Sequence, residues 1–176
     1  AYAAVLRRLA AVAPTFACLG NHDAIVAAGP VGEVARTAAV VRLLREARAD
    51  VLVNETREVA VRGGRIRVSG LGDLWTGQNH PARCLTPTRG PGREPLAHVL
   101  LNHNPDARLA AMPYHWDLML CGHTHGGQLG VPGVAEWLAP VSDKSHIEGL
   151  RERSGRLIHI TRGVGSLYGV RLFCRP

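Results

Sequence analysis

Three short apolar runs, each followed by a polar cluster that contains histidine, constrain the fold of this chain most. Residues 15–19, 96–101 and 117–121 have the length and aliphatic content of buried strands. The clusters that follow them are Gly20-Asn21-His22-Asp23, His103 and Gly122-His123-Thr124-His125. Because ligands of α/β proteins bind at the carboxyl ends of strands, we expect these clusters to meet at one edge of a sheet.

The rest of the chain supplies the other elements of an α/β fold. Residues 31–48 follow the helical period, and Gly63-Gly64 separates two strand-like segments as a hairpin turn does. Further predicted elements are a strand at 51–54, hairpin strands at 58–62 and 65–71, a long loop at 74–95, and strands at 157–161 and 167–173. The chain has 176 residues, of which 46% are hydrophobic, so it can bury a core. We therefore predict one α/β domain, residues 1–176, with mixed sheets.

The net charge of +7 suggests nucleic-acid binding, but the distribution of that charge argues against it. All basic residues except Lys144 are arginine, they are scattered along the chain, and only 5% of residues are aromatic. Nucleic-acid modules usually concentrate charge on one face and add aromatic side chains for stacking. We expect no specific nucleic-acid partner, although a positive field attracts phosphate-bearing substrates.

Cysteine spacing and hydropathy exclude other classes. No two of the four cysteines form a C-x-x-C pair, so neither a zinc knuckle nor a thioredoxin motif is present. The sequence shows no apolar run of 18 residues and no signal peptide. The expected location is the bacterial cytoplasm or a membrane surface, and the sequence does not distinguish them.

The three histidine clusters have the chemistry of a metal centre. Imidazole is the commonest metal ligand, and its combination with oxygen donors favours Mn, Fe or Zn over Ca. His123 and His125 are two residues apart, so each can serve a different ion of a two-metal site. A single such histidine is more often a turn or core residue, but three clusters in this order favour function over structure.

The ordered motifs resemble those of the calcineurin-like metallophosphoesterases, which are D-x-H, G-D-x-x-D, G-N-H-[DE], H and G-H-x-H. This chain shows Gly20-Asn21-His22-Asp23, His103 and Gly122-His123-Thr124-His125. The residues around these motifs are similar to those of a bacterial branch of the family that includes UDP-2,3-diacylglucosamine pyrophosphatases. The segments that carry this second likeness are 13–17, Gly72-Asp73-Leu74-Trp75, 103–106, 126–128 and 161–165.

The resemblance implies an α/β/β/α sandwich and a role for each residue. Asn21, His103 and His123 would bind one metal ion and His125 the other. His22 would assist the leaving group, with Asp23 orienting its ring. Two divalent ions would hold a hydroxide that attacks a phosphodiester or diphosphate bond in line. The implied substrate is a small nucleotide-type or lipid-linked molecule, so a membrane surface remains open as a partner.

The chain departs from the family at its start. Neither D-x-H nor G-D-x-x-D occurs before Gly20, and Gly72-Asp73 does not replace the second motif because it follows GNHD and leads to Thr76. We interpret the chain as a fragment lacking N-terminal strands and one C-terminal strand, inactive alone. The alternative is a pseudo-enzyme that binds metal or phosphate without turnover. Substrate, metal identity, upstream targeting and oligomeric state are not determined by the sequence.

Overall fold

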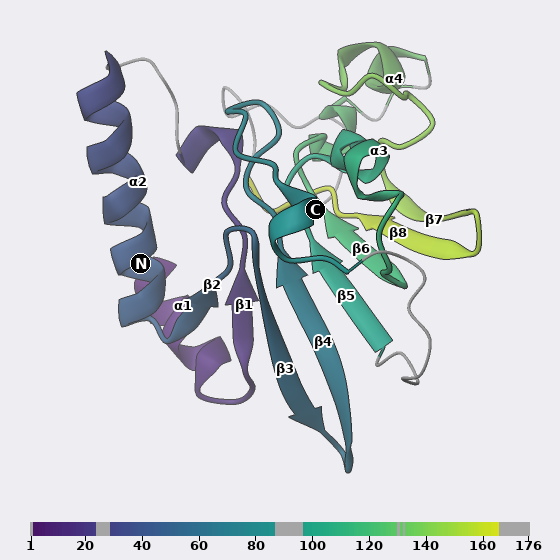
Figure 1. Ribbon diagram of the computed structural model, residues 1–176. Coiled ribbons are helices and arrows are strands. Elements are labelled where there is room, and N and C mark those ends of the chain that lie inside the picture. Colours follow the sequence, from purple (N-terminus) through teal and green to yellow (C-terminus); the bar gives the residue numbers. More distant parts are fainter. Residues whose placement is uncertain (1, 24–28, 87–96, 130, 132, 166–176) are drawn as a thin grey trace.

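The computed structural model describes residues 2–23, 29–86, 97–129, 131 and 133–165 (Figure 1). Its helices are α1 (Tyr2–Ala10), α2 (Gly29–Glu46), α3 (Arg108–Ala111) and α4 (Val134–Leu138). Its strands are β1 (Thr15–Ala17), β2 (Ala49–Val51), β3 (Glu55–Val61), β4 (Gly64–Gly70), β5 (Ala97–Leu101), β6 (Leu118–Cys121), β7 (Gly149–Arg153) and β8 (Arg156–Ile160). Short 3₁₀ turns are η1 (Asn21–Asp23), η3 (Pro81–Arg83), η4 (Pro105–Ala107) and η5 (His125–Gly127).

A six-stranded mixed sheet forms the centre of the molecule, in the order β3-β4-β5-β6-β8-β7. The four inner strands β4, β5, β6 and β8 are parallel, and β3 and β7 pair antiparallel at the two edges. The carboxyl ends of the parallel strands therefore lie along one edge, which is the upper edge in Figure 1. This arrangement confirms the predicted α/β class with a mixed sheet.

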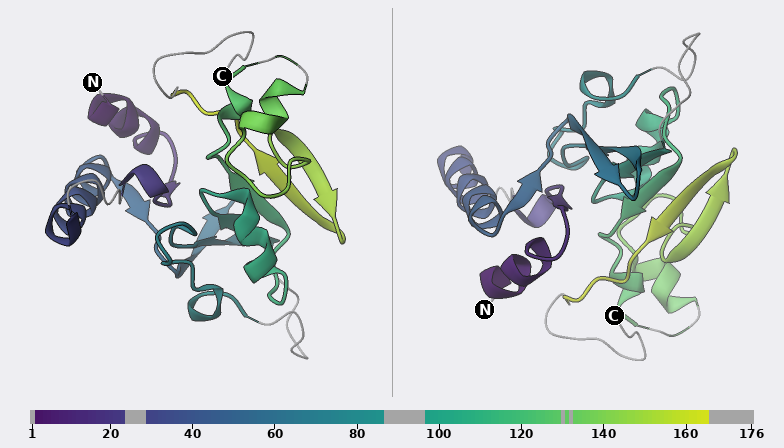
Figure 2. Two further views of the ribbon diagram at one scale, coloured as in Figure 1. Left: turned by 90° about the horizontal axis from the view of Figure 1, so that it is seen from above. Right: turned by 90° about the horizontal axis from the view of Figure 1, so that it is seen from below.

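Strands β1 and β2 form a separate parallel pair beside the main sheet. Helix α2 packs on β2, and α1 lies on the same side of the molecule (Figure 2). The pair also approaches β4, because Leu52, just after β2, lies against Gly70 so closely that no side chain would fit there. This contact places the end of β1 next to the carboxyl edge of the main sheet.

The main core lies between the sheet and α3. Its buried members are Leu71, Leu85, Leu100, Ala111, Trp116, Met119, Cys121, Ile158 and Ile160. The indole N–H of Trp116 donates to the Ala111 carbonyl at 3.0 Å, and the Arg156 guanidinium lies 4.9 Å from the Trp116 ring centre. The central strands β5, β6 and β8 thus supply five of these nine residues, and Trp116 is the one aromatic residue among them.

Several predicted elements differ from the structure in their details. The hairpin turn is Arg62-Gly63 instead of Gly63-Gly64, because Val61 pairs with Gly64. The strand predicted at 51–54 lies at Ala49–Val51, and the predicted loop 74–95 includes the turn η3. The predicted strand at 167–173 and residues 87–95 of that loop lie outside the described residues.

The structure also contains strand β7 and helix α4, which the sequence pattern does not predict.

No helix in the described part of the chain is both long and apolar enough to cross a bilayer.

Candidate functional site

Three strand ends bring the predicted site residues to the carboxyl edge of the sheets. Asn21 lies in η1 after β1, His103 follows β5, and His123 follows β6. The backbone links two of these loops directly, since Gly122 N–H donates to the His103 carbonyl at 3.0 Å. The predicted convergence of the three clusters is therefore present in the structure.

The side chains of Asn21, His103 and His123 form a continuous polar cluster. His103 Nε2 lies 3.0 Å from Asn21 Oδ1 and 3.2 Å from His123 Nδ1. The two imidazole rings meet edge to face, with 4.9 Å between their centres. Three potential metal donors from three separate loops are thus linked through His103, which is within hydrogen-bond distance of both Asn21 and His123.

The Pro140 carbonyl determines which ring nitrogen of His123 carries the proton and which one presents a lone pair to this cluster. His123 Nε2 lies 3.0 Å from Pro140 O, and a carbonyl only accepts, so Nε2 must carry the proton. In the neutral ring Nδ1 is then unprotonated and faces His103 Nε2. A carbonyl that fixes the tautomer in this way is the usual outer partner of a metal-binding histidine.

Both rings are held neutral at physiological pH. Burial lowers the pKa of His123 to about 4, with the nearby His103 as the next cause. Burial also lowers the pKa of His103, against the opposing effect of Asp73 and then Asp23. Neutral imidazole is the form that binds a metal ion.

Close backbone packing shapes the site. A Cβ at Gly20 would lie 2.7 Å from the His103 ring, so this position has room only for glycine. His123 and His125 adopt positive φ values of 70° and 52°, which are uncommon for residues other than glycine and occur often at functional sites. The segment after β6 is thus folded to present both histidines at the edge of the sheet.

The donor set fits a divalent transition-metal ion. At a ligand distance of about 2.1 Å, neighbouring donors of a six-coordinate ion lie about 3 Å apart, as His103 Nε2 does from Asn21 Oδ1 and from His123 Nδ1. Among the described residues, however, no group of three or more His, Cys, Asp or Glu side chains converges to hold a metal. The set reaches three donors only because the Asn21 amide oxygen is counted.

The other predicted site residues lie close enough to this cluster for their charges to act on His103. His22 is exposed in η1, and a charge on it would lower the pKa of His103. A charge on His125 would likewise lower the pKa of both His103 and His123. The Nδ1 atom of His125 lies 3.4 Å from the Gly165 carbonyl oxygen. Asp23 accepts a hydrogen bond from Gly20 N–H at 2.8 Å, which closes the GNHD turn. Its role in orienting His22 stays a prediction.

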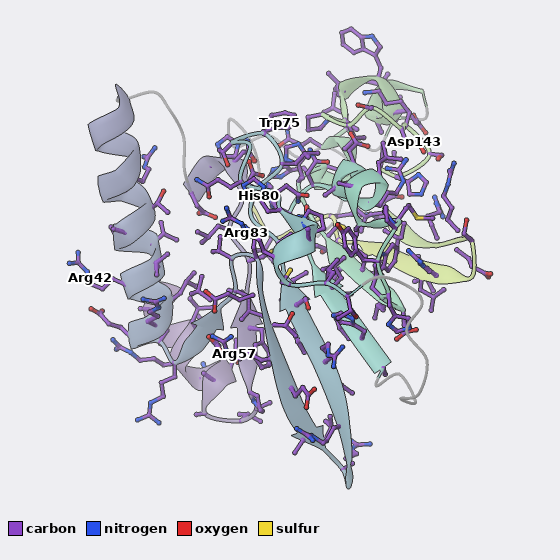
Figure 3. The ribbon with its side chains drawn as sticks, viewed as in Figure 1. Arg42, Arg57, Trp75, His80, Arg83 and Asp143 are labelled. Atoms are coloured by element: carbon purple, nitrogen blue, oxygen red, sulfur yellow. The ribbon has the colours of Figure 1, made fainter. Side chains whose placement is uncertain are left out.

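Two residues from the loop after β4 also reach the site. The Asp73 carboxylate is 2% exposed and raises the pKa of both His103 and His123 by its charge. The Trp75 ring meets His123 edge-on, with 4.4 Å between ring centres, and is 58% exposed at the upper edge of the sheet (Figure 3). Sequence reasoning used this segment only as a mark of resemblance. Its position directly after a strand is a signal in the sequence, but that position alone does not distinguish the two residues from those of an ordinary turn.

Known proteins with similar sequences decide the family. The phosphodiesterase YaeI of Escherichia coli is 46% identical to the chain over all 176 residues, which is 60% of the length of YaeI. This chain belongs to the metallophosphoesterase superfamily. The match includes the GNHD, His103 and GHTH segments described above, since it covers the whole chain.

More distant relatives agree with this membership. The uncharacterized metallophosphoesterase YkuE of Bacillus subtilis is 36% identical over 103 residues, covering 58% of this chain and 35% of YkuE. The UDP-2,3-diacylglucosamine pyrophosphatase LpxG of Chlamydia trachomatis is 28% identical over 148 residues, covering 78% of this chain and 42% of LpxG. The chain thus spans less than two thirds of each of these relatives. It matches no protein-family model, and no solved structure is significantly similar to it.

Proposed function

We propose that this chain forms part of a metal-dependent hydrolase of phosphodiester or diphosphate bonds. The observation that carries the proposal is the cluster of Asn21, His103 and His123, whose donor atoms lie 3.0 and 3.2 Å apart at the ends of three separate strands. Superfamily membership implies metal ions, and the name of YaeI supports a phosphodiester substrate. The name of LpxG supports a lipid-linked diphosphate as the other substrate class.

Each candidate residue has a distinct role in this proposal. Asn21, His103 and His123 would hold one of two divalent ions, and His125 would contribute to the other. Bound divalent ions supply charge for the phosphoryl oxygens and lower the pKa of water. The exposed His22, next to Asn21 in the chain, would give a proton to the departing oxygen, since a positioned imidazole can act as a general acid. The family's α/β/β/α sandwich, with ligands from the D-x-H and G-D-x-x-D motifs, would complete the centre.

Metal binding by the chain itself is the first test. Titration of the 176-residue chain with MnCl₂, followed by the electron paramagnetic resonance signal of free Mn²⁺, should show one site of micromolar to millimolar affinity. His103→Ala and Asn21→Ala should weaken binding at least tenfold, while His80→Ala, an exposed histidine outside the cluster, should not change it. Equal affinity in all four proteins would refute the proposed centre.

Turnover is the second test and separates an enzyme from a binding module. We expect the 176-residue chain alone to hydrolyse bis-p-nitrophenyl phosphate slowly or not at all, because its sequence contains no D-x-H and no G-D-x-x-D motif. A protein that adds these motifs upstream should be active with Mn²⁺. In that protein, His22→Ala should reduce kcat about 100-fold or more while Mn²⁺ affinity is retained.

The alternative function is a catalytically incomplete module that binds metal or phosphate. The absence of the G-D-x-x-D motif from these 176 residues favours this alternative. A protein that includes the upstream motifs, binds two Mn²⁺ ions and still turns over neither a phosphodiester nor a phosphomonoester would establish this alternative.

A further inference from the structure

We propose that Asp73 is a positioning residue of this site, a buried carboxylate that compensates the charge of the cation held by Asn21, His103 and His123. The inference rests on the proposed metal centre and goes beyond the ligand set that family resemblance implies. It assigns a role to a residue that lies outside the GNHD, His and GHTH motifs.

The fold places Asp73 at the same edge as the cluster. Asp73 follows β4, which pairs in parallel with β5, and β5 leads into His103. Two residues further on, the Trp75 ring packs against His123. The loop after β4 therefore reaches both histidines, and Asp73 lies at its beginning.

The backbone around Asp73 is held firmly. Asn54 Oδ1 accepts hydrogen bonds from Gly72 N–H at 3.2 Å and from His80 N–H at 3.0 Å, so it ties together both ends of the loop. Asp73 Oδ2 accepts from Thr76 N–H at 2.9 Å, and the Asp73 carbonyl accepts from Gln78 N–H at 3.0 Å. One oxygen of the carboxylate is thus fixed by the loop.

The second oxygen of Asp73 is buried without a partner. Within the described ranges of the chain, no hydrogen-bond donor reaches Asp73 Oδ1, although the side chain is only 2% exposed. A buried carboxylate without a compensating partner is strongly unfavourable, and such groups are normally paired or close to a metal ion. The free oxygen therefore leaves a position for a cationic partner that the described residues do not provide.

The charge balance of the cluster points to the same conclusion. Asn21 and the two neutral histidines are uncharged donors, so an ion of charge +2 bound by them would gain no compensation from its ligands. The Asp73 charge acts on both the His103 and the His123 ring. Asp23 acts on His103 too, but its carboxylate already binds Gly20 N–H. Asp73 is the buried carboxylate with an unused oxygen at this position.

The decisive experiment compares Asp73→Asn with wild type by Mn²⁺ titration of the chain under the resonance assay above. Asparagine has nearly the same shape and its amide oxygen can still accept from Thr76 N–H, so the variant removes the charge and puts an NH2 group in place of Oδ1. We expect the Mn²⁺ dissociation constant to rise about 10- to 100-fold, the usual effect of losing an outer-shell partner. Asp73→Ser, which also keeps an oxygen acceptor, should show a rise of the same order.

Asp117→Asn is the matched control. Asp117 also accepts a backbone hydrogen bond, from His98 N–H at 2.7 Å, but it lies before β6 at the opposite end of the sheet. Its substitution removes one negative charge and should change Mn²⁺ affinity less than twofold. An equal loss in Asp117→Asn and Asp73→Asn would attribute the effect to net charge and overturn the proposal.

Thermal unfolding distinguishes charge compensation from a merely structural role. In the absence of metal, Asp73→Asn should unfold at the same temperature as wild type or higher, because an uncompensated buried charge is gone. The stabilisation by Mn²⁺ should shrink, since it depends on affinity. A lower Tm without metal, together with unchanged Mn²⁺ affinity, would overturn the role of Asp73 while leaving the metal centre intact. Wild-type protein that binds no Mn²⁺ would overturn both.

Discussion

At the scale of single residues, the site depends on how His123 is oriented. The hydrogen bond to Pro140 O fixes the proton on Nε2, and burial keeps the ring neutral with a pKa of about 4. Together these effects leave an unprotonated Nδ1 facing His103. The imidazole is thus prepared for a cation before the cation arrives, which reduces the reorganisation that binding requires.

Gly20→Ala tests how much room the cluster has. The new Cβ would lie 2.7 Å from the His103 ring, so the ring must leave the position in which it contacts Asn21 and His123. We expect Mn²⁺ affinity to fall about tenfold, with a loss of unfolding free energy of about 1–3 kcal/mol from overpacking. Gly64→Ala is the control, because its Cβ would meet nothing closer than 3.6 Å. Unchanged Mn²⁺ binding in Gly20→Ala would show that His103 does not need its present position.

Residue types alone predicted the histidines but not the carboxylate. Asn21, His103 and His123 stand out because each follows an apolar run, and the structure brings them together as expected. Asp73 follows a strand as well, yet an Asp in a Gly-rich loop is common in turns. Its importance depends on burial and on the neighbouring histidines, and neither is visible in one sequence.

At the scale of elements, a buried arginine holds the segment that carries Pro140. Arg108 at the start of α3 contacts the Asp106 carboxylate at 3.2 Å and the Asp143 carboxylate at 2.7 Å. Asp106 also accepts from Ser142 N–H at 2.6 Å. Asp143 lies beside α3 near the upper edge of the sheet (Figure 3). These contacts fix the chain between α4 and β7, and with it the carbonyl that orients His123.

Arg108→Met should therefore affect both stability and the site. Removing the buried cation takes one partner from the Asp106 and Asp143 carboxylates, although Asp143 keeps its contacts with Ser145 and His146. We expect the free energy of unfolding to fall by up to about 3–5 kcal/mol, the typical cost of breaking a buried ion pair. Looser attachment of Pro140 should also weaken Mn²⁺ binding. Urea unfolding and Mn²⁺ titration measure the two effects separately.

The matched control for Arg108→Met is Arg153→Met. Arg153 also approaches Asp143, at 3.7 Å, but its side chain is 55% exposed. Exposed ion pairs contribute about 0–1 kcal/mol, so this change should be small in both assays. Equal effects of the two substitutions would mean that the burial of Arg108 adds nothing to stability and that Arg108 does not hold the segment that carries Pro140.

Local pattern predicted elements only where their burial is regular. Strands β5 and β6 are apolar runs and were expected nearly at their observed bounds. Strand β7, with the sequence Gly-Leu-Arg-Glu-Arg, is mostly exposed and polar, and it is a strand because it pairs with β8. The hairpin turn lies one residue earlier than predicted, because Arg62 adopts a positive φ of 43° beside Gly63. Such features depend on tertiary pairing that a single-sequence pattern does not contain.

At the scale of the whole molecule, the topology assembles the site from distant parts of the chain. Asn21 comes from the small β1-β2 sheet, and both histidines come from the main sheet. The order of the strands places these ends side by side, although more than 80 residues separate Asn21 from His103. The stability of the main sheet and the integrity of the site are therefore coupled.

A buried histidine in the centre of that sheet couples stability to pH. His98 on β5 is almost fully buried, and its Nε2 lies 2.7 Å from the Ser69 hydroxyl on β4. Burial lowers the pKa of His98 to about 4, with Arg67 and His115 acting in the same direction and Asp117 opposing them. His98 lies on a central strand away from the cluster, so this effect is separate from metal binding.

The pH dependence follows from the direction of that shift. The pKa of His98 is about 4 in the folded protein and about 6.5 in the unfolded chain, so between these values the unfolded state binds more protons. Stability is then fully present above pH 6.5 and is lost as pH falls toward 4, by about 3 kcal/mol for this histidine. Urea unfolding from pH 7 to pH 4 should show a shallower loss in His98→Gln than in wild type. The exposed His159→Gln should retain the wild-type slope, and an identical slope in all three proteins would mean that His98 is not the group that carries this effect.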